Sequence, residues 1–335
     1  MKLKLLTALL LSVMMVLSLA ACGGGGDTKD DSASGDLSGK TIIIGNITPV
    51  TGAQAAYGLA ITNSIQLAIA EINAAGGILG ATVKLSTKDD QGTPAEAVSG
   101  FNSLLSEGAS AIIGATLSSC TSAITSLADD EGIVLVTPSS TADSITTKDD
   151  YVFRSCFKDS FQGEMVAAYA KDQGWTKAAV LYATGDTYSS GLHDSFVKAA
   201  EKYGIEIVCE QSSSDTGAVD FSSQLATIAA SGADMLFAPY YYDAVGPKII
   251  PQAREAGFKG AIMGCDGFDG TQDYTTGDLS AYENVYFTNH YSPEDSSEIV
   301  QNYVKNYTAK YGSESMNALG ALAYDAMYMV KQAIE

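Results

Sequence analysis

Short runs of apolar, often β-branched residues alternate with longer amphipathic segments from residue 41 onward. In the first half, the segments between the runs carry apolar residues at intervals of three and four, as in the stripe formed by Ile61, Ile65 and Ile69. This spacing is typical of a helix with one buried face, whereas the short runs are typical of buried strands. The predicted strands of this half lie at residues 41–44, 83–86, 111–113 and 133–136.

The same alternation continues after residue 151. Predicted strands lie at residues 178–182, 206–208, 235–237 and 261–263, and predicted helices lie at residues 162–172, 192–203, 221–230 and 245–256. Continuous apolar strands joined by helical crossovers predict parallel sheets covered on both faces, and the number of units exceeds one compact sheet. We therefore predict an α/β fold of two doubly wound parallel-sheet lobes, with a ligand site where strand ends of the two lobes face each other.

The N-terminus predicts export. Lys2 and Lys4 make residues 1–4 a short basic region. Residues 5–20 are almost wholly apolar, and Leu19-Ala20-Ala21-Cys22 ends this apolar run. The run is too short to span a bilayer comfortably and has the organisation of a secretion signal. Its end resembles a bacterial lipobox, which implies a signal peptide at residues 1–21 and a lipid on Cys22. The alternative is cleavage by ordinary signal peptidase, with Cys22 unmodified.

Residues 22–39 are rich in glycine, serine and aspartate and predict a flexible tether between the anchor and the folded body. The formal charge of the whole chain is −20 at pH 7. Such an acidic balance repels nucleic acid, so we expect no nucleic-acid partner.

Enzyme and metal signatures are poor. Besides Cys22, the four cysteines have no metal-ligand spacing and leave open either one or two disulfides or reduced, buried thiols. The motifs of serine hydrolases, nucleotide-binding loops and zinc proteases are absent. For both histidines, His193 and His290, a solvent-facing or structural role is the better prediction. We expect no catalytic residues, no metal and no cofactor.

Hydroxyl-rich loops follow two strands of the first half. One contains Ser118 and Ser119 and leads into a helix, and the other contains Ser139 and Thr141. Hydroxyls and free backbone N–H groups at such a position can bind an anion. Helix capping is the alternative for each loop alone, but two such loops at neighbouring strand ends favour a site for a carboxylate.

The second half offers groups that suit a cation. Tyr188 follows one predicted strand, Tyr240 and Tyr241 follow another, and Asp266 follows a third. A carboxylate with aromatic neighbours can bind an ammonium group. A partly buried aromatic patch and a turn residue are the alternatives. An anion site in one lobe and a cation site in the other together predict a small zwitterionic ligand.

Several short motifs lie along the chain, namely Asp89-Asp90, Pro94 and the segments 44–52, 71–80 and 220–225. With these motifs and the lipobox, the chain resembles the leucine-isoleucine-valine type of ABC-transporter substrate-binding protein, which has a type I periplasmic-binding fold. Members of this family usually continue beyond the helix predicted at residues 319–335, with further strands and a third crossing. The sequence ends at that helix, which leaves a truncated chain and an unusual terminus as alternatives.

The resemblance also implies roles for single residues. Ser118 matches a carboxylate-binding hydroxyl, Ser139 and Thr141 match positions whose backbone and hydroxyl groups bind the ligand, and Asp266 matches an acidic residue that takes the ammonium. The positions that match aromatic walls of the pocket are Tyr57, Tyr188 and either Tyr240 or Tyr241.

The implied protein is the solute-binding component of an ABC importer, held by lipid at the extracytoplasmic face of a bacterial membrane. We expect a monomer that closes on an amino acid, branched-chain or related, and then binds permease subunits. Lobe I is expected at residues 40–157 and 289–335, and lobe II at residues 158–288. The alternatives are a ligand-sensing receptor of the same fold that feeds a signalling partner and, less favoured, an exported hydrolase.

Overall fold

The computed structural model describes residues 35–147, 151–275 and 277–335. The predicted signal peptide, Cys22 and most of the predicted tether lie outside these residues. Within the described residues, a compact unit begins at Asp36. The backbone N–H of Leu37 donates to the carbonyl of Leu79, so the end of the predicted tether already contacts the folded body.

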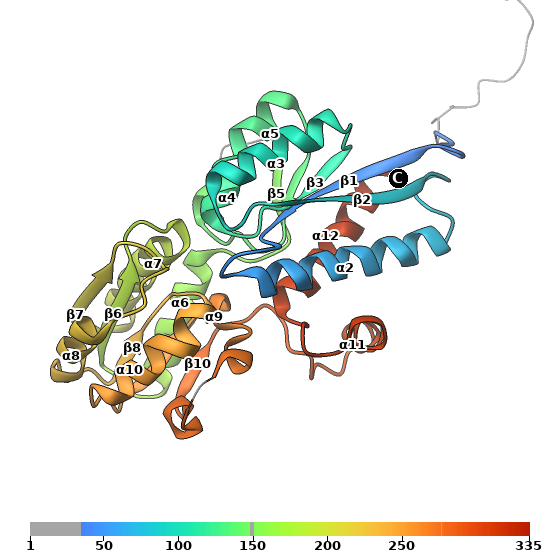
Figure 1. Ribbon diagram of the computed structural model, residues 1–335. Coiled ribbons are helices and arrows are strands. Elements are labelled where there is room, and N and C mark those ends of the chain that lie inside the picture. Colours follow the sequence, from blue (N-terminus) through green and yellow to red (C-terminus); the bar gives the residue numbers. More distant parts are fainter. Residues whose placement is uncertain (1–34, 148–150, 276) are drawn as a thin grey trace, which may run out of the picture. The chain divides into compact units, whose positions relative to one another are not determined.

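The first sheet is parallel throughout and has the strand order β2-β1-β3-β4-β5. Its longest strands, β1 and β2, pair residue by residue from Thr41 opposite Thr82 to Thr48 opposite Asp89. The crossovers place the carboxyl ends of these strands at one edge of the sheet, which faces the second sheet (Figure 1). The strands are β1 (Thr41–Thr48), β2 (Thr82–Asp89), β3 (Ala111–Ile113), β4 (Leu135–Thr137) and β5 (Val152–Arg154).

The second sheet is also parallel throughout and has the order β10-β9-β8-β6-β7. Its central strands β8 and β9 are wholly buried, because helices cover both faces. The strands are β6 (Lys177–Ala183), β7 (Glu206–Ser213), β8 (Met235–Phe237), β9 (Ala261–Gly264) and β10 (Val285–Phe287).

Helices connect the strands in both sheets. In the first, α12 packs beside α2, and α11 also contacts α2, which brings the end of the chain back to the first sheet (Figure 1). In the second, α6 packs against α7. The α-helices are α2 (Ala55–Ala74), α3 (Pro94–Ser106), α4 (Ser118–Ser122), α5 (Thr125–Glu131), α6 (Asp159–Asp172), α7 (Thr187–Tyr203), α8 (Ser222–Ala230), α9 (Tyr242–Ala244), α10 (Ile250–Glu255), α11 (Glu298–Tyr311) and α12 (Ala318–Ile334).

Tighter or wider helical turns fill several connections of the chain. A π-helical segment lies between α9 and α10, and 3-10 turns cluster between β9 and β10. These segments are η1 (Asp143–Thr146), η2 (Val245–Ile249), η3 (Asp266–Phe268), η4 (Thr271–Tyr274) and η5 (Leu279–Tyr282).

We use lobe I for the first sheet with α2 to α5, α11 and α12, and lobe II for the second sheet with α6 to α10. The predicted α/β fold of two parallel-sheet lobes is confirmed. The numerical lobe boundaries stay a prediction. Sequence reasoning did not predict β5, β10 or α11, since the two strands are three-residue edge strands and α11 buries only Tyr303 and Tyr307.

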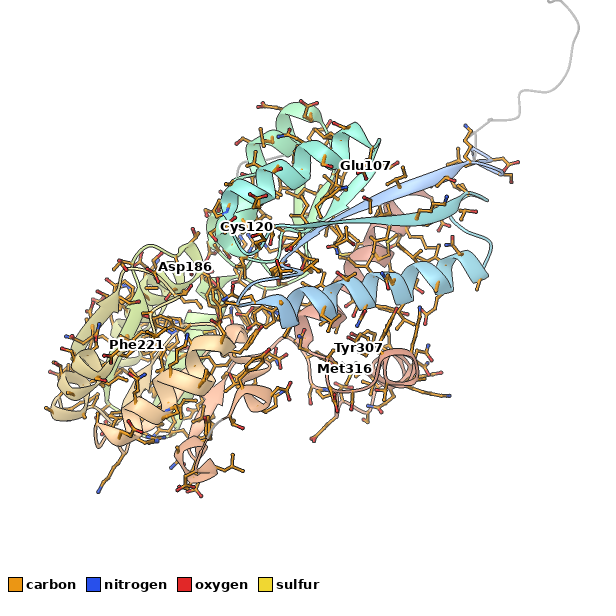
Figure 2. The ribbon with its side chains drawn as sticks, viewed as in Figure 1. Glu107, Cys120, Asp186, Phe221, Tyr307 and Met316 are labelled. Atoms are coloured by element: carbon orange, nitrogen blue, oxygen red, sulfur yellow. The ribbon has the colours of Figure 1, made fainter. Side chains whose placement is uncertain are left out.

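Apolar packing holds both lobes. Phe101 and Leu104 of α3 are fully buried in lobe I, and Phe221 and Leu225 are fully buried in lobe II. A smaller cluster joins α11 to α2 through Tyr307, with Met316 packed against it (Figure 2). Within the described residues, no helix combines the length and apolar character that crossing a bilayer requires.

Candidate ligand site

A small space of about 10 Å³ lies where the two lobes meet, about the room that one water molecule needs. Each side chain that lines it is at most 6% exposed. Lobe I contributes residues from α2, from the loop after β3 with the start of α4, from the loop after β4 and from α12. Lobe II contributes residues that follow β6, β8 and β9. The lining residues are Tyr57, Thr116, Leu117, Ser118, Ser139, Tyr188, Tyr241, Asp266, Gly267 and Leu319.

Hydrogen bonds across the space hold the lobes together. The hydroxyl of Tyr57 donates to the carbonyl of Gly267 at 2.6 Å. Beside this contact, the hydroxyl of Tyr242 donates to the carbonyl of Ala53 at 2.9 Å. The rings of Tyr57 and Tyr242 meet edge to face, with centroids 4.7 Å apart. The lobes are therefore closed in this structure.

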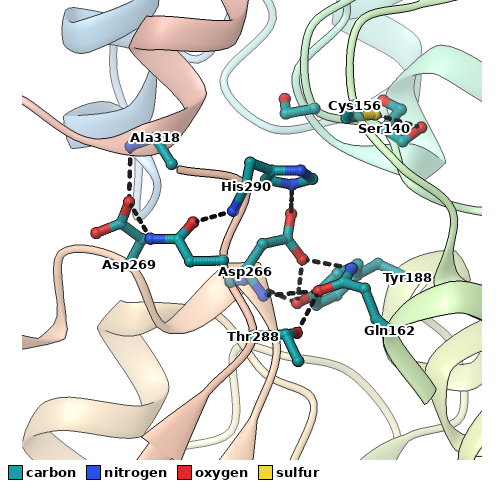
Figure 3. A network of polar contacts seen from close by, with 12 residues as sticks. Ser140, Cys156, Gln162, Tyr188, Asp266, Asp269, Thr288, His290 and Ala318 are labelled. Carbon is teal, nitrogen blue, oxygen red and sulfur yellow. Dashed lines mark hydrogen bonds and ion pairs between the residues drawn. The ribbon is translucent and has the colours of Figure 1, made fainter. Parts of the chain in front are cut away.

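The lobe II wall is built around the carboxylate of Asp266. Oδ1 accepts hydrogen bonds from Nε2 of Gln162 at 2.9 Å and from the hydroxyl of Tyr188 at 3.0 Å. Nε2 of His290 lies 3.2 Å from Oδ2. Gln162 is held in turn by Thr288, whose hydroxyl donates to Oε1 of the amide at 2.7 Å (Figure 3). The carboxylate is only 3% exposed, so these donors replace the water that it loses on burial.

The lobe I wall consists of hydroxyl groups. The hydroxyl of Ser139 donates to the carbonyl of Thr116 at 2.8 Å, and Oγ of Ser118 accepts from the backbone N–H of Ala142 at 3.3 Å. Helix α4, which Ser118 begins, has only five residues, so its dipole is short and the hydroxyls dominate this wall. Gly114 lets the start of the loop after β3 lie close to β1, because a Cβ at this position would lie 2.4 Å from the carbonyl oxygen of Ile47.

Two buried polar groups near the site lack a well-formed hydrogen bond among the described residues. Neither the carboxyl oxygens of Asp159 nor the hydroxyl of Thr141 forms one, although the carbonyl of Thr141 accepts from the backbone N–H of Asp159. Burial raises the pKa of Asp159 well above its usual value, the nearby side chain of Thr141 offsets part of this rise in pKa, and the negative charge of Asp266 adds to it. Asp159 thus places a second, unsatisfied carboxyl near Asp266.

The aromatic side chains of the site are protonated donors. Burial raises the pKa of Tyr57, Tyr188 and Tyr241 well above the usual range. The rings of Tyr188 and Tyr241 stack with centroids 5.0 Å apart. Tyr240 does not line the space, because its side chain points the opposite way from that of Tyr241 and packs edge to face on Phe221 in the core of lobe II.

Six of the residues that the sequence predicted line the space: Tyr57, Ser118, Ser139, Tyr188, Tyr241 and Asp266. Ser119, Thr141 and Tyr240 do not. Sequence reasoning missed Asp159, Gln162 and His290. Asp159 and Gln162 lie three residues apart on the first turn of α6, so one buried face carries both, but helical spacing alone marks such a face as core.

Neither the four described cysteines nor a metal-binding group takes part in the candidate ligand site. Cys120, Cys156, Cys209 and Cys265 are all free thiols in this structure, and only Cys120 and Cys265 of the four are buried. Among the described residues, no group of histidine, cysteine, aspartate and glutamate side chains is arranged to hold a metal ion.

Two parallel-sheet lobes closed over a buried polar space define the class of solute-binding proteins. A family model described as periplasmic binding protein matches residues 41–335. The Leu/Ile/Val-binding protein homolog 3 of Brucella melitensis is 31% identical over 303 residues, which cover 88% of this chain and 78% of the relative.

Solved structures agree with that class. The leucine binding protein LivK of Thermotoga maritima has a TM-score of 0.81 at 32% identity, covering 88% of this chain and 82% of its own. The branched-chain amino acid transporter substrate binding protein LivJ of Streptococcus pneumoniae, solved with isoleucine, has a TM-score of 0.79 at 33% identity, covering 88% and 84%. The chain belongs to the periplasmic binding protein family, within the leucine-isoleucine-valine type of ABC-transporter substrate-binding proteins.

Proposed function

We propose that this chain is not an enzyme and captures a zwitterionic α-amino acid between its lobes for an ABC importer. The observation that carries the proposal is the buried carboxylate of Asp266, which lines the same space as the hydroxyl of Ser118. Ser139 also lines it, but its hydroxyl would have to turn away from the carbonyl of Thr116 to donate to a ligand. A carboxylate suits an ammonium group, and neutral hydroxyls suit a carboxylate. The names of the relatives support the amino-acid class.

Asp159 is a further candidate for stabilising the ammonium group, although it does not line the space. An ammonium group has three N–H donors, and a buried carboxyl without a partner is unfavourable. Asp159 is buried and lies close enough to Asp266 for the charge of Asp266 to raise its pKa. A bound cation would also reduce the repulsion between the two carboxyl groups, so binding and the ionisation of Asp159 favour each other.

The remaining walls suit an aliphatic side chain. Tyr57, Tyr188 and Tyr241 present ring surfaces, and Leu117 and Leu319 present methyl groups. Burial of an aliphatic side chain against them contributes about 25 cal/mol per Å² of apolar surface removed from water. The chemistry of these walls therefore favours a branched-chain or related amino acid, for which the lobes would have to separate slightly, since the space now has a volume of only about 10 Å³. The isoleucine complex of LivJ supports the same class of ligand.

The proposed test is calorimetric titration of the whole chain with the common amino acids. For the tightest binder, the test continues with two analogues, one without the amino group and one without the carboxylate. A zwitterion site binds the parent compound and loses at least about tenfold in affinity for each analogue, since each leaves buried groups unpaired.

A charge-matched variant is the control for effects of the overall charge of the chain. Asp130 is exposed on α5, so Asp130→Asn removes one negative charge without touching the site and should bind like the unchanged protein. If every amino acid fails while a compound with only a carboxylate binds, the zwitterion assignment is wrong. Binding of both analogues as tightly as the parent compound would also overturn it.

We further propose extracytoplasmic anchoring of a monomer through lipid on Cys22, with the closed lobes presented to permease subunits. Closure changes the surface that a partner meets, so a permease can distinguish the loaded protein. Mass spectrometry of the mature protein checks the anchor: its first residue should be Cys22 carrying acyl chains, and Cys22→Ala should release the protein from membranes. Unmodified Cys22 in mature protein would contradict it.

A further inference from the structure

Two chain crossings join the lobes beside the site, and aromatic rings link them. Phe157 lies on the crossing between β5 and α6, and His290 lies on the crossing between β10 and α11. Their rings stack with centroids 3.7 Å apart and planes inclined by 30°. The imidazole therefore rests on a segment that must move whenever the lobes open or close.

The same imidazole contacts the proposed ammonium-binding carboxylate. Nε2 of His290 lies 3.2 Å from Oδ2 of Asp266, and the two side chains are 2% and 5% exposed. Gln162 and Tyr188 both bond to Oδ1, so His290 is the one partner that the described residues give to Oδ2. A carboxylate only accepts, so Nε2 carries the hydrogen that it donates.

A second contact fixes the crossing to the same turn. Asp266 begins the short turn η3, and Asp269 follows it. Oδ2 of Asp269 accepts from the backbone N–H of Ala318 at 2.6 Å and from Nδ2 of Asn289 at 3.1 Å. The backbone N–H of His290 then donates to Oδ1 of Asn289 at 2.8 Å (Figure 3). The crossing thus holds both ends of the turn that carries Asp266.

We infer that His290 is a positioning residue for amino-acid binding, which couples the interlobe crossing to the orientation of the Asp266 carboxylate. This inference rests on the proposed function. His290 does not line the ligand space, so it acts on the ligand through Asp266. Opening that moves the crossing would release Oδ2 and weaken the grip on the ammonium, so the site would be complete only when the lobes are closed.

Two substitutions separate the hydrogen bond from the ring stacking. His290→Phe keeps a ring against Phe157 but removes the donor, whereas His290→Gln removes the ring but keeps an N–H donor at a similar reach. We expect His290→Phe to weaken amino-acid binding about tenfold, because it removes a hydrogen bond to a charged group. His290→Gln should recover affinity to within about threefold of the unchanged protein.

His193 provides the matched control. It is the only other histidine of the chain and lies on α7, where Glu210 and Asp194 flank its ring. His193→Gln should leave the affinity unchanged. If His290→Gln binds as weakly as His290→Phe, the ring and not the hydrogen bond matters, and the inference is wrong.

A double-mutant cycle tests the path through Asp266. In an Asp266→Asn background, His290→Phe should change affinity by less than about twofold, because the charge that it positions is already absent. A further tenfold loss in that background would show that His290 acts independently of Asp266 and would overturn the inference. The titrations use the amino acid that binds the unchanged protein best.

Nitrogen NMR of protein with ¹⁵N-labelled histidine gives a readout that needs no ligand. With His193→Gln as the parent, a single imidazole remains. We expect the tautomer with hydrogen on Nε2, and Asp266→Asn should shift that signal. A signal from the other tautomer that ignores Asp266→Asn would overturn the inference. If no amino acid binds but the expected tautomer appears, the proposed function fails while the coupling of His290 to Asp266 stands.

Discussion

The two walls of the ligand site use different chemistry for the same task. On the lobe I side, Ser118 and Ser139 are neutral, and their hydroxyls are already engaged with backbone groups of their own lobe. On the lobe II side, Asp266 is a buried carboxylate whose donors come from Gln162, Tyr188 and His290. The first wall is a set of hydrogen bonds between two neighbouring loops of lobe I, and the second is a charge held by donors from α6, α7 and a crossing between the lobes.

This difference indicates which lobe should contribute most of the binding free energy and which should fix the position of the ligand. A neutral hydroxyl contributes about 1 kcal/mol to a hydrogen bond, whereas a desolvated charge pair contributes several times more. Three distant segments also meet at Asp266, because Gln162 lies on α6, Tyr188 on α7 and His290 on a crossing between the lobes. Lobe I should therefore set the place of the ligand, and lobe II should set how tightly it is held.

The largest effect should follow removal of the lobe II charge. Asp266→Asn preserves the shape of the side chain and its contact with Tyr188 but leaves a bound ammonium without its main counter-charge. We expect amino-acid affinity to fall about 100-fold, or about 3 kcal/mol, measured by calorimetric titration. Asp130→Asn on the exposed face of α5 is the control. A loss below about fivefold would remove the asymmetry between the walls.

Lobe I has its own buried carboxyl, Asp90, which does not line the space, and its ionisation decides whether lobe I buries a charge as lobe II does. Burial raises the pKa of Asp90 to about 6, although the backbone N–H of Gly92 donates to Oδ1. Well below about pH 4 the carboxyl is neutral in both folded and unfolded chains. As the pH rises toward 6, the unfolded chain ionises first, so folding stability falls, by about 3 kcal/mol in full.

Urea unfolding at about pH 4 and pH 7 checks this sign. Asp90→Asn lacks the titrating group, so the stability of the unchanged protein relative to this variant should decrease by about 2 to 3 kcal/mol between the two pH values. If the difference in unfolding free energy between the unchanged protein and Asp90→Asn is the same at both pH values, Asp90 is ionised in the folded protein and adds charge to lobe I.

The fold was predictable because burial leaves a periodic trace in the sequence. Every predicted strand overlaps an observed strand, and the stripe of Ile61, Ile65 and Ile69 lies on the buried face of α2. The edge strands β5 and β10 could not be predicted, because a strand of three residues that is paired on one side only gives too short an apolar pattern. Their place follows from pairing with a neighbouring strand, which no local window contains.

The site was predictable where its residues directly follow strands, as Ser118, Tyr188 and Asp266 do. The groups that hold Asp266 were not, since His290 is 24 residues and Gln162 104 residues away in the sequence. A single residue of register also decides between Tyr240 and Tyr241. Alternation of side chains sends one to the core and the other to the ligand, and only the tertiary structure fixes which.

A substitution at the closely packed Gly267 tests how little space the lobe II wall leaves around Tyr188. A Cβ at this position would lie 2.8 Å from the hydroxyl of Tyr188 and 2.7 Å from the carbonyl oxygen of Tyr240. Gly267→Ala should displace Tyr188 from Asp266, lowering affinity about tenfold and stability by about 1 to 2 kcal/mol. Titration and urea unfolding measure both. Gly217→Ala, exposed in the same lobe, is the control, and equal behaviour of the two variants would contradict the expectation.

The smallest effect should come from the lobe I wall, where two adjacent serines allow a matched comparison. Ser118 lines the space and is 2% exposed, whereas Ser119 is partly exposed and does not line it. Ser118→Ala removes one hydrogen bond from a neutral hydroxyl to the ligand carboxylate, so affinity should fall about fivefold, or about 1 kcal/mol, in calorimetric titration. Ser119→Ala should leave affinity unchanged. If Ser118→Ala instead matches the loss of Asp266→Asn, the hydroxyl wall binds as strongly as the charged one, and lobe I holds the ligand as tightly as lobe II does.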